Sequence, residues 1–309
     1  MRLLVVCHDA GGAELIAAWL ATEPHPGASV CAVLGGPAVG VFARTLGPEL
    51  DVRAALPSLD GIDLLVCGSS GAAELERRAV VAARAAGVPS AVWLDHWGGY
   101  RDRFVVDGTL VLPDEVWVAD PEAQQLARAA LPGAEIRLRG NPYLDRMVAE
   151  IRELEAGGAD RPGPGAGPRV LYVTEPTSEA ARRLTGDPLA WGYDERDALS
   201  AWLRAASAQP QPPAAVRVRV HPAETPEKYA ATLEAGAGRR PVPIAFSAGT
   251  TLAADVAWAD VVVGCDTMAM VVGLAAGRRV VSSIPPGGRP LTLPFAAIER
   301  FAPPGGRPA

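Results

Sequence analysis

The sequence predicts an α/β protein made of two Rossmann-like domains whose parallel sheets face a central cleft. Short apolar runs rich in β-branched residues alternate with helical stretches, which is the pattern of parallel βαβ units. Several of these runs end in polar, glycine-containing turns. A segment rich in glycine, proline and alanine, residues 157–168, interrupts the pattern, which then restarts. We therefore expect an N-terminal domain over 1–150, a linker over 151–168 and a C-terminal domain over 169–309.

Each half is predicted to contain several strands of a buried parallel sheet, because these runs are short and nearly continuously apolar. In the first half the strands are expected at 3–7, 29–34, 63–67, 90–94, 113–120 and 136–139. In the second half they are expected at 169–173, 216–220, 241–245 and 259–263. Helices are expected up to about residue 20, over 72–86, from about 121, over 195–206, after 247–251 and up to the glycine at 277.

Composition narrows the functional class. The 309 residues are 49% hydrophobic and 21% charged, which is ordinary for a globular protein. A net charge of −6 and a pI near 5.4 argue against nucleic-acid binding as the main function. The four scattered cysteines are expected to be free thiols of a reducing compartment. No apolar run approaches the roughly 20 residues of a membrane span, and the first strand is too short for a signal peptide. We expect a cytoplasmic protein; peripheral membrane association and oligomeric state stay open.

The turn after the first predicted strand carries candidate catalytic groups. His8 and Asp9 precede the paired glycines Gly11 and Gly12, which allow a sharp turn and a close approach to a ligand and are candidate acceptor-binding residues. The spacing matches neither a dinucleotide fingerprint nor a P-loop. The alternative is that Asp9 caps a helix while His8 is an ordinary turn residue.

A second polar segment follows the strand at 90–94. It contains Asp95, His96, Tyr100 and Arg101 around two further glycines, and such a loop is poor core material. We interpret it as a ligand-binding loop, and specifically as part of an acceptor site. The alternative is a surface loop whose aromatic side chains cover the edge of the sheet.

In the second half, two strands end in groups suited to binding an anion. His221 and Pro222 follow one strand, and Asp266 and Thr267 form the turn between another strand and its helix. The first N–H groups of a helix and a nearby hydroxyl make an anion site. Because the carboxyl ends of strands in an open α/β sheet meet at one crevice, these groups are expected to face one ligand. The alternative for His221 is a solvent-exposed residue at the end of a strand.

Glu175 and Ser178 lie on the exit turn of the first strand of the second half. They are candidate donor-binding residues, and a helix cap is the alternative of equal weight.

With these motifs in view, the chain resembles glycosyltransferases of the GT-B fold. The run Gly140-Asn141-Pro142-Tyr143-Leu144-Asp145 looks like the crossing-over segment of several GT-B enzymes and of UDP-sugar 2-epimerases, and His221-Pro222 matches a pair that meets the nucleotide phosphate in sialyltransferase-like families. The resemblance is to the bacterial surface-polysaccharide branch, which includes sialyltransferase-like, polysialyltransferase-like and CDP-glycerol transferase enzymes. Two features depart from it. Asp266-Thr267 stands where a hydroxyl pair is the better match, so Asp266 would hold a ribose hydroxyl or the helix N-terminus, and the proline- and glycine-rich end leaves little room for closing helices.

The resemblance implies a glycosyltransferase that moves a sugar from a nucleotide donor, with a CMP-sugar favoured, to a glycan or small-molecule hydroxyl. His221 would favour departure of the phosphate, and Asp9 would be the general base, with Asp95 or His96 in reserve. No metal or cofactor is expected, since Asp-x-Asp and His/Cys ligand spacings are missing. The alternatives are a UDP-sugar 2-epimerase or hydrolase of the same fold and a non-catalytic sugar-nucleotide-binding protein.

Overall fold

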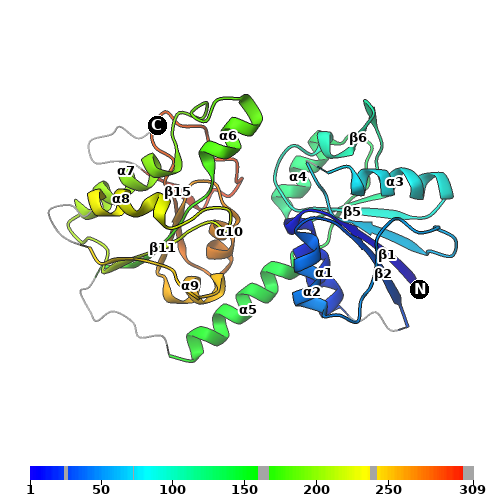
Figure 1. Ribbon diagram of the computed structural model, residues 1–309, viewed down its shortest axis with the longest axis horizontal. Coiled ribbons are helices and arrows are strands. Elements are labelled where there is room, and N and C mark those ends of the chain that lie inside the picture. The colour runs from blue at the N-terminus through cyan, green and yellow to red at the C-terminus, as the bar shows by residue number, and fades with distance from the viewer. Residues whose placement is uncertain (24–26, 72, 159–166, 237–241, 302–309) are drawn as a thin grey trace. The chain divides into compact units, whose positions relative to one another are not determined.

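The computed structural model describes residues 1–23, 27–71, 73–158, 167–236 and 242–301. The chain divides into two compact units, unit 1 over Met1–Arg146 and unit 2 over Met147–Ala309. Each unit is an α/β layer structure built on a parallel sheet, as Figure 1 shows. The predicted α/β class with two Rossmann-like halves is therefore confirmed.

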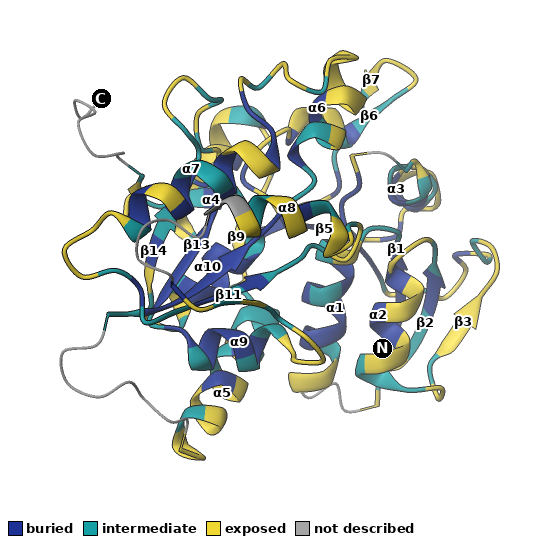
Figure 2. Cartoon of the chain, turned by 60° about the vertical axis from the view of Figure 1, so that its left-hand side comes forward, coloured by how far each residue is buried: buried dark blue, intermediate teal, exposed yellow. Residues whose placement is uncertain are grey.

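Unit 1 is built on a seven-stranded parallel sheet of order β3-β2-β1-β4-β5-β8-β9. The chain adds strands on one side of β1 and then on the other, so the order reverses between β1 and β4. The strands are β1 (Arg2–Cys7), β2 (Ser29–Leu34), β3 (Asp51–Arg53), β4 (Leu64–Cys67), β5 (Ser90–Leu94), β8 (Glu115–Val118) and β9 (Ile136–Leu138). The central strands are almost wholly buried, whereas the edge strand β3 is exposed, as Figure 2 shows.

Four connections in the described part of unit 1 contain an α-helix, as is usual between parallel strands. They contain α1 (Ala10–Thr22), α2 (Ala38–Leu46), α3 (Leu75–Ala86) and α4 (Pro121–Ala130). The connection from β5 to β8 runs through the 3-10 turn η1 (Arg101–Phe104) and the short hairpin of β6 (Val105–Val106) and β7 (Thr109–Leu110). Trp19 of α1 packs edge-to-face on Trp93 and Trp117, with ring centroids 6.1 and 5.6 Å away. This aromatic cluster fixes α1 against the sheet, and with it the polar turn that precedes α1.

Unit 2 has a six-stranded parallel sheet of order β12-β11-β10-β13-β14-β15, the strand order of a dinucleotide-binding Rossmann sheet. Here the order reverses between β10 and β13. The strands are β10 (Arg169–Val173), β11 (Ala215–Arg219), β12 (Ile244–Phe246), β13 (Val261–Gly264), β14 (Arg279–Ser282) and β15 (Ile298–Arg300). The helices are α5 (Pro142–Ala156), which begins in unit 1, α6 (Thr177–Thr185), α7 (Glu195–Ser207), α8 (Glu227–Gly236), α9 (Leu252–Trp258) and α10 (Met268–Ala275).

The structure corrects one expectation about local structure. Residues 151–156, predicted as linker, are the last turns of α5, because Met147 and Ile151 are buried at helical spacing and Glu155 pairs with Arg278. Residues 159–166 of that linker lie outside the described residues. The helix after 247–251 is capped by Thr251, whose hydroxyl accepts the Ala254 N–H.

Candidate functional site

Three neighbouring strands of unit 2 end in polar residues at one edge of the sheet. In the parallel register Val173 of β10 pairs with Arg219 of β11, and Tyr172 pairs with Val263 of β13. The residues just after these strands therefore lie side by side at the carboxyl edge. They are Thr174 and Glu175 after β10, His221 after β11, and Asp266 and Thr267 after β13. The place where the strand order reverses is the usual ligand position in open α/β sheets.

His221 is held as a neutral hydrogen-bond donor. Its backbone N–H donates to the Thr174 hydroxyl at 3.0 Å, and its Nδ1 lies 3.1 Å from the backbone nitrogen of Ala223. Because that N–H can only donate, Nδ1 accepts and the ring proton is on Nε2. Partial burial lowers the pKa of His221, with Glu224 opposing the shift. The imidazole therefore presents an N–H to a ligand without carrying a full charge.

Glu175 lies beside the turn that begins α10. Its Oε2 accepts the backbone N–H of Asp266 at 3.3 Å. Burial raises the pKa of Glu175 to about 7, and the neighbouring carboxylate of Asp266 adds to the shift. Part of the population therefore carries a protonated Glu175 at neutral pH.

Asp266 organises the loop that follows β14. Its buried carboxylate accepts hydrogen bonds from the backbone and hydroxyl of Thr292 at 3.1 and 2.6 Å, from the backbone of Leu293 at 3.2 Å and from Arg289 at 3.2 Å. These donors compensate the charge of the buried Asp266 carboxylate. Thr267 is the N-cap residue of α10 and makes no capping bond with its side chain. Its hydroxyl stays available beside the first N–H groups of the helix.

Arg289 is a residue of this edge that sequence reasoning missed. Its guanidinium carbon lies 3.7 Å from the ring centroid of Trp191, and its Nη2 reaches Asp266. The backbone N–H of Arg289 donates to the carbonyl of Trp191 at 2.9 Å. The buried Nε has no hydrogen-bond partner among the described residues. A planar cation fixed in this way suits a phosphate. The apolar run of β14 could have indicated Arg289. A strand there places the loop that follows it, which contains Arg289, at the carboxyl edge of the sheet.

The two other predicted donor residues of unit 2 lie differently. The backbone N–H and hydroxyl of Ser178 donate to Glu195 at 2.8 and 2.9 Å, so Ser178 joins α6 to α7. Glu195 also pairs with Lys228. Pro222 is exposed and shapes the turn after His221.

Unit 1 has a corresponding edge, where the turns after β1, β4 and β5 meet. A Cβ atom added to Gly12 would lie 2.8 Å from the Cα of Gly68, so α1 and the β4 turn pack backbone against backbone. A Cβ atom on Gly11 would lie 2.0 Å from Oδ2 of Asp95. Both glycines are therefore needed for packing at the start of α1, in addition to any ligand contact.

His8 and Asp9 form a hydrogen-bonded pair on the same edge. Nδ1 of His8 lies 2.7 Å from Oδ1 of Asp9, and both side chains are about one-third exposed. An ionised carboxylate can only accept, so Nδ1 carries the proton and Nε2 keeps its lone pair. Asp9 is the N-cap residue of α1 but makes no capping bond with its side chain. The pair has the arrangement of a general base oriented by an acid.

Contacts with other elements fix both the backbone and the ring of His8. Its N–H donates to the buried carboxylate of Glu76 at 2.6 Å. Cβ atoms added to Gly35 or Gly36 would approach the imidazole ring to 2.9 and 2.7 Å. The position of His8 therefore depends on the loop after β2 and on helix α3.

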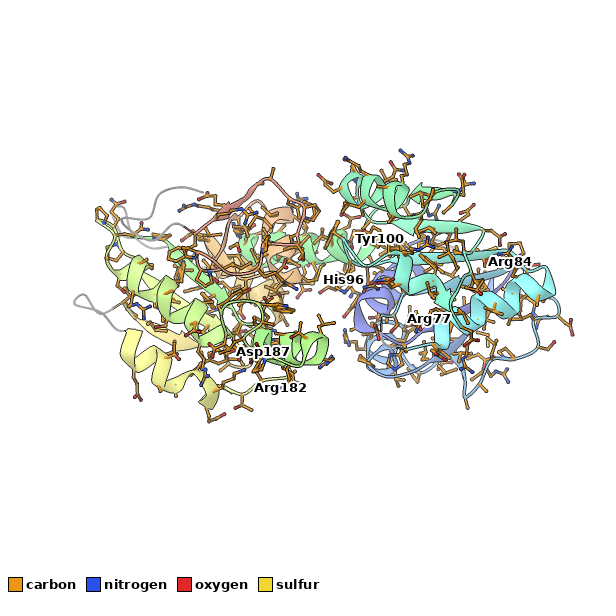
Figure 3. All side chains as sticks on the ribbon, turned by 90° about the horizontal axis from the view of Figure 1, so that it is seen from above. Arg77, Arg84, His96, Tyr100, Arg182 and Asp187 are labelled. Atoms are coloured by element: carbon orange, nitrogen blue, oxygen red, sulfur yellow. The ribbon has the colours of Figure 1, made fainter. Side chains whose placement is uncertain are left out.

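The polar loop after β5 is tied to the β4 turn by a buried network. Asp95 accepts hydrogen bonds from the Ser69 hydroxyl at 2.9 Å and from Arg103 at 3.2 Å. His96 is half exposed, with its Nε2 3.5 Å from Asp95. Tyr100 is buried, and Figure 3 shows His96 and Tyr100 on this segment. Arg101 is exposed. Asp95 therefore serves mainly to order the loop, and His96 and Arg101 are its exposed polar groups.

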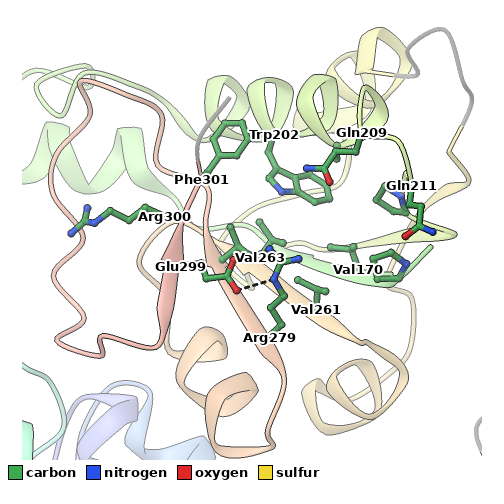
Figure 4. A pocket seen from close by; sticks show the side chains of 14 residues that line it. Val170, Trp202, Gln209, Gln211, Val261, Val263, Arg279, Glu299, Arg300 and Phe301 are labelled. Carbon is green, nitrogen blue, oxygen red and sulfur yellow. Dashed lines mark hydrogen bonds and ion pairs between the residues drawn. The ribbon is translucent and has the colours of Figure 1, made fainter. Parts of the chain in front are cut away.

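A separate cavity of about 260 Å³ lies in unit 2 between the sheet and α7, as shown in Figure 4. None of the described residues that line it is Glu175, His221, Asp266 or Thr267. It is thus distinct from the carboxyl-edge groups. Within the described part of the chain, no group of three or more His, Cys, Asp or Glu residues could hold a metal ion. No helix there is long and apolar enough to cross a membrane. All four cysteines are free.

Comparisons with known proteins identify the architecture. No protein-family model matches the chain, and no curated protein sequence matches it. Among solved structures, UDP-GlcNAc 2-epimerase from Neisseria meningitidis bound to UDP-GlcNAc is similar, with a TM-score of 0.60, 10% identity, and coverage of 91% of this chain and 82% of that one. MurG from Acinetobacter baumannii gives a TM-score of 0.53 at 12% identity, covering 91% and 78%. The glycosyltransferase VinC in complex with dTDP gives 0.51 at 13% identity, covering 92% and 81%. At these identities the likeness concerns the fold, and it shows that this chain has the GT-B-like architecture of two Rossmann-type units.

Proposed function

We propose that the protein is a glycosyltransferase that uses a nucleotide-activated sugar and binds the donor through unit 2. One observation carries the proposal. His221, Glu175 and the Asp266-Thr267 turn follow three adjacent strands at the point where the strand order reverses. This is where open α/β sheets bind nucleotides.

Three kinds of hydrogen-bond donor would contact the phosphate of the sugar nucleotide. They are the Nε2–H of His221, the first N–H groups of α10 with the Thr267 hydroxyl, and the guanidinium of Arg289. Negative charge grows on the phosphate as the sugar leaves, and fixed donors stabilise that charge most in the transition state. We assign positioning roles to Asp266, which holds Arg289, and to Ser178, which joins α6 to α7.

Unit 1 would activate the acceptor hydroxyl. In the geometry of the His8–Asp9 pair, His8 takes the proton through Nε2 and Asp9 orients the ring. This refines the expectation that Asp9 is itself the base. Acceptor contacts are assigned to His96 and Arg101, the exposed polar groups of the loop after β5, whereas Tyr100, also predicted to bind the acceptor, is buried.

Two kinds of similarity bear on the nucleobase of the donor nucleotide. The sequence resemblance favours a CMP-sugar, whereas the structural neighbours with named nucleotides hold UDP-GlcNAc or dTDP. All of these nucleotides carry a pyrimidine. We therefore propose a pyrimidine nucleotide sugar, with CMP and UDP as the two forms to distinguish.

A UDP-sugar 2-epimerase or hydrolase is the second candidate. UDP-GlcNAc 2-epimerases are among the structures similar to this chain, and the raised pKa of Glu175 supplies a carboxyl able to exchange a proton near neutral pH. A protein that binds sugar nucleotides without turnover is the third. Turnover without an acceptor supports the epimerase or hydrolase, and binding without any turnover supports the non-catalytic binding protein.

The test is a thermal-shift panel of CMP, CDP, UDP, GDP and dTDP on the wild type, His221→Ala and an exposed control, Arg84→Ala in unit 1. A nucleotide at 100 times its Kd stabilises the folded state by about 2.7 kcal/mol. We expect a shift with CMP or UDP that His221→Ala reduces and Arg84→Ala retains. If no nucleotide shifts the melting temperature, the proposed donor site is wrong. Incubation of the selected sugar nucleotide with and without hydroxyl acceptors then separates transfer from epimerisation or hydrolysis.

A further inference from the structure

Glu175 occupies a position where a carboxylate and a bound phosphate would compete. Its Oε2 accepts the N–H of Asp266, which belongs to the turn that begins α10. The same turn is the anion-binding element of the proposed donor site. A phosphate placed there would lie beside the Glu175 carboxyl, and two like charges in close contact disfavour joint ionisation.

The charged neighbours of Glu175 come from three elements. Asp266 lies on the β13–α10 turn, Arg289 on the loop after β14, and Glu224 on the turn after β11. The Asp266 carboxylate already has four hydrogen-bond donors, including Arg289. Glu224 accepts from the Thr174 and Tyr229 hydroxyls and from Lys228. The buried neutral groups nearby are Tyr172, Tyr193 and Cys265.

This arrangement makes Glu175 the carboxyl of the cluster that is easiest to protonate. Both neighbouring acids have several donors, and Arg289 is already engaged with Asp266. Burial, followed by the charge of Asp266, raises the pKa of Glu175 to about 7 before any ligand is present.

We propose that the Glu175 carboxyl takes up one proton from solvent when a sugar nucleotide binds, and donates it as an O–H hydrogen bond to the donor phosphate. The inference rests on the proposed nucleotide site. It adds that donor binding consumes a proton and that the donor affinity falls as the pH rises.

The pH window separates Glu175 from His221. Burial lowers the pKa of His221 from 6.5, so its change of charge lies below pH 6.5. Between pH 6.5 and 8.5 the free Glu175 loses its proton. If the bound carboxyl stays protonated, the affinity falls about 25-fold across this range, with an uptake of about 0.9 proton per site at pH 8.

The experiment is isothermal titration of the wild type with UDP-GlcNAc or CMP-sialic acid, whichever the nucleotide panel selects. The phosphate groups of both ligands, and the carboxylate of CMP-sialic acid, keep one ionisation state between pH 6.5 and 8.5. Titrations at pH 8 in two buffers of different ionisation enthalpy count the protons taken up. Glu175→Gln mimics the protonated carboxyl and keeps a donor for the phosphate. The matched control is Glu234→Gln, an exposed acid on α8.

We expect the wild type and Glu234→Gln to take up nearly one proton and to weaken at high pH. We expect Glu175→Gln to take up none and to bind at pH 8.5 as tightly as the wild type does at pH 6.5. Binding without proton uptake, or equal uptake in Glu175→Gln, would overturn this inference and leave the proposed function intact. If neither sugar nucleotide binds at any pH, the proposed function fails, and this inference fails with it.

Discussion

The backbones of Gly12 and Gly68 are in direct contact: a Cβ atom at Gly12 would lie 2.8 Å from the Cα of Gly68 and 3.1 Å from the nitrogen of Ser69. This contact seats the start of α1 on the turn after β4. It thereby sets the place of the His8–Asp9 pair, because Asp9 is the N-cap residue of α1.

Gly12→Ala is therefore expected to destabilise the protein by about 1–3 kcal/mol, since neither backbone can move aside without disturbing a buried strand. Gly40 in α2 is the control, because a Cβ atom there meets nothing within 4 Å. Gly40→Ala is expected to stabilise the protein by about 0.5–1 kcal/mol through helix propensity. Urea unfolding of both variants checks the pair. Equal effects on stability would show that the close contact carries no energy.

Much of this architecture could be predicted from the sequence. The central strands are short, apolar and β-branched, and β2, β5 and β10 begin and end where expected. The peripheral elements carry weaker signals. The edge strand β3 is three exposed residues, and α6 has polar residues on most of its surface. Their structure depends on tertiary contacts that local patterns do not encode.

The residues of the candidate site also fall into those that local sequence patterns predict and those that depend on tertiary contacts. Residues directly after a predicted strand, such as His221, could be placed at the sheet edge by topology. Arg289 lies seven residues beyond β14 and reaches the edge through its contacts with Asp266 and Trp191. Glu76 reaches His8 across 68 residues of sequence. Such contacts need a three-dimensional structure.

Asp9→Asn is expected to lower kcat of the transfer reaction about 10²- to 10⁴-fold, because an amide can donate to Nδ1 and so favour the wrong tautomer of His8. His8→Gln should lower kcat to a similar extent. Nucleotide affinity should stay unchanged in both variants, since the proposed donor site lies in unit 2. Steady-state kinetics together with nucleotide titration would check this. Loss of nucleotide binding in Asp9→Asn would contradict the division of roles between the two units.

Arg289→Lys is expected to weaken nucleotide binding about 10-fold or more, although the charge is kept. Lysine lacks the planar fork that stacks on Trp191 while it reaches Asp266. Losing a hydrogen bond to a charged group costs about 1.5–3 kcal/mol. Trp191→Leu should act in the same direction by releasing the guanidinium. Arg84→Lys is the matched control, and equal affinity of both lysine variants would remove Arg289 from the donor site.

Asp255 is expected to be a main stabilising residue of unit 2. It is fully buried and accepts hydrogen bonds from Arg217, Arg219, Ser247 and Thr250. Burial by itself would raise the pKa of Asp255, but these donors outweigh it and lower the pKa below 3.8.

The contribution of Asp255 is therefore complete above about pH 4 and is lost as the pH falls through its lowered folded value. Asp255→Asn should destabilise the protein by about 3–5 kcal/mol at pH 7, because two arginines lose their counter-charge. Asp260→Asn, at a partly exposed acid directly before β13, is the comparison and should cost far less. Thermal unfolding at pH 7 would check this, and similar losses in both variants would refute it.

The contribution of Glu175 to stability depends on pH in the opposite direction to that of Asp255. The folded pKa of Glu175, about 7, lies above the ordinary value of 4.5, so the folded state binds a proton that the unfolded state releases. Its contribution to stability is full below about pH 4.5 and declines as the pH rises to 7. Glu175→Gln removes this titration. The variant should therefore gain stability relative to the wild type between pH 5 and 8, by an amount on the order of 2–3 kcal/mol. Urea unfolding at several pH values measures the difference, with Glu234→Gln expected to run parallel to the wild type. A constant difference for Glu175→Gln across this range would mean that Glu175 stays ionised at the carboxyl edge, and that a bound phosphate finds a fixed negative charge beside it.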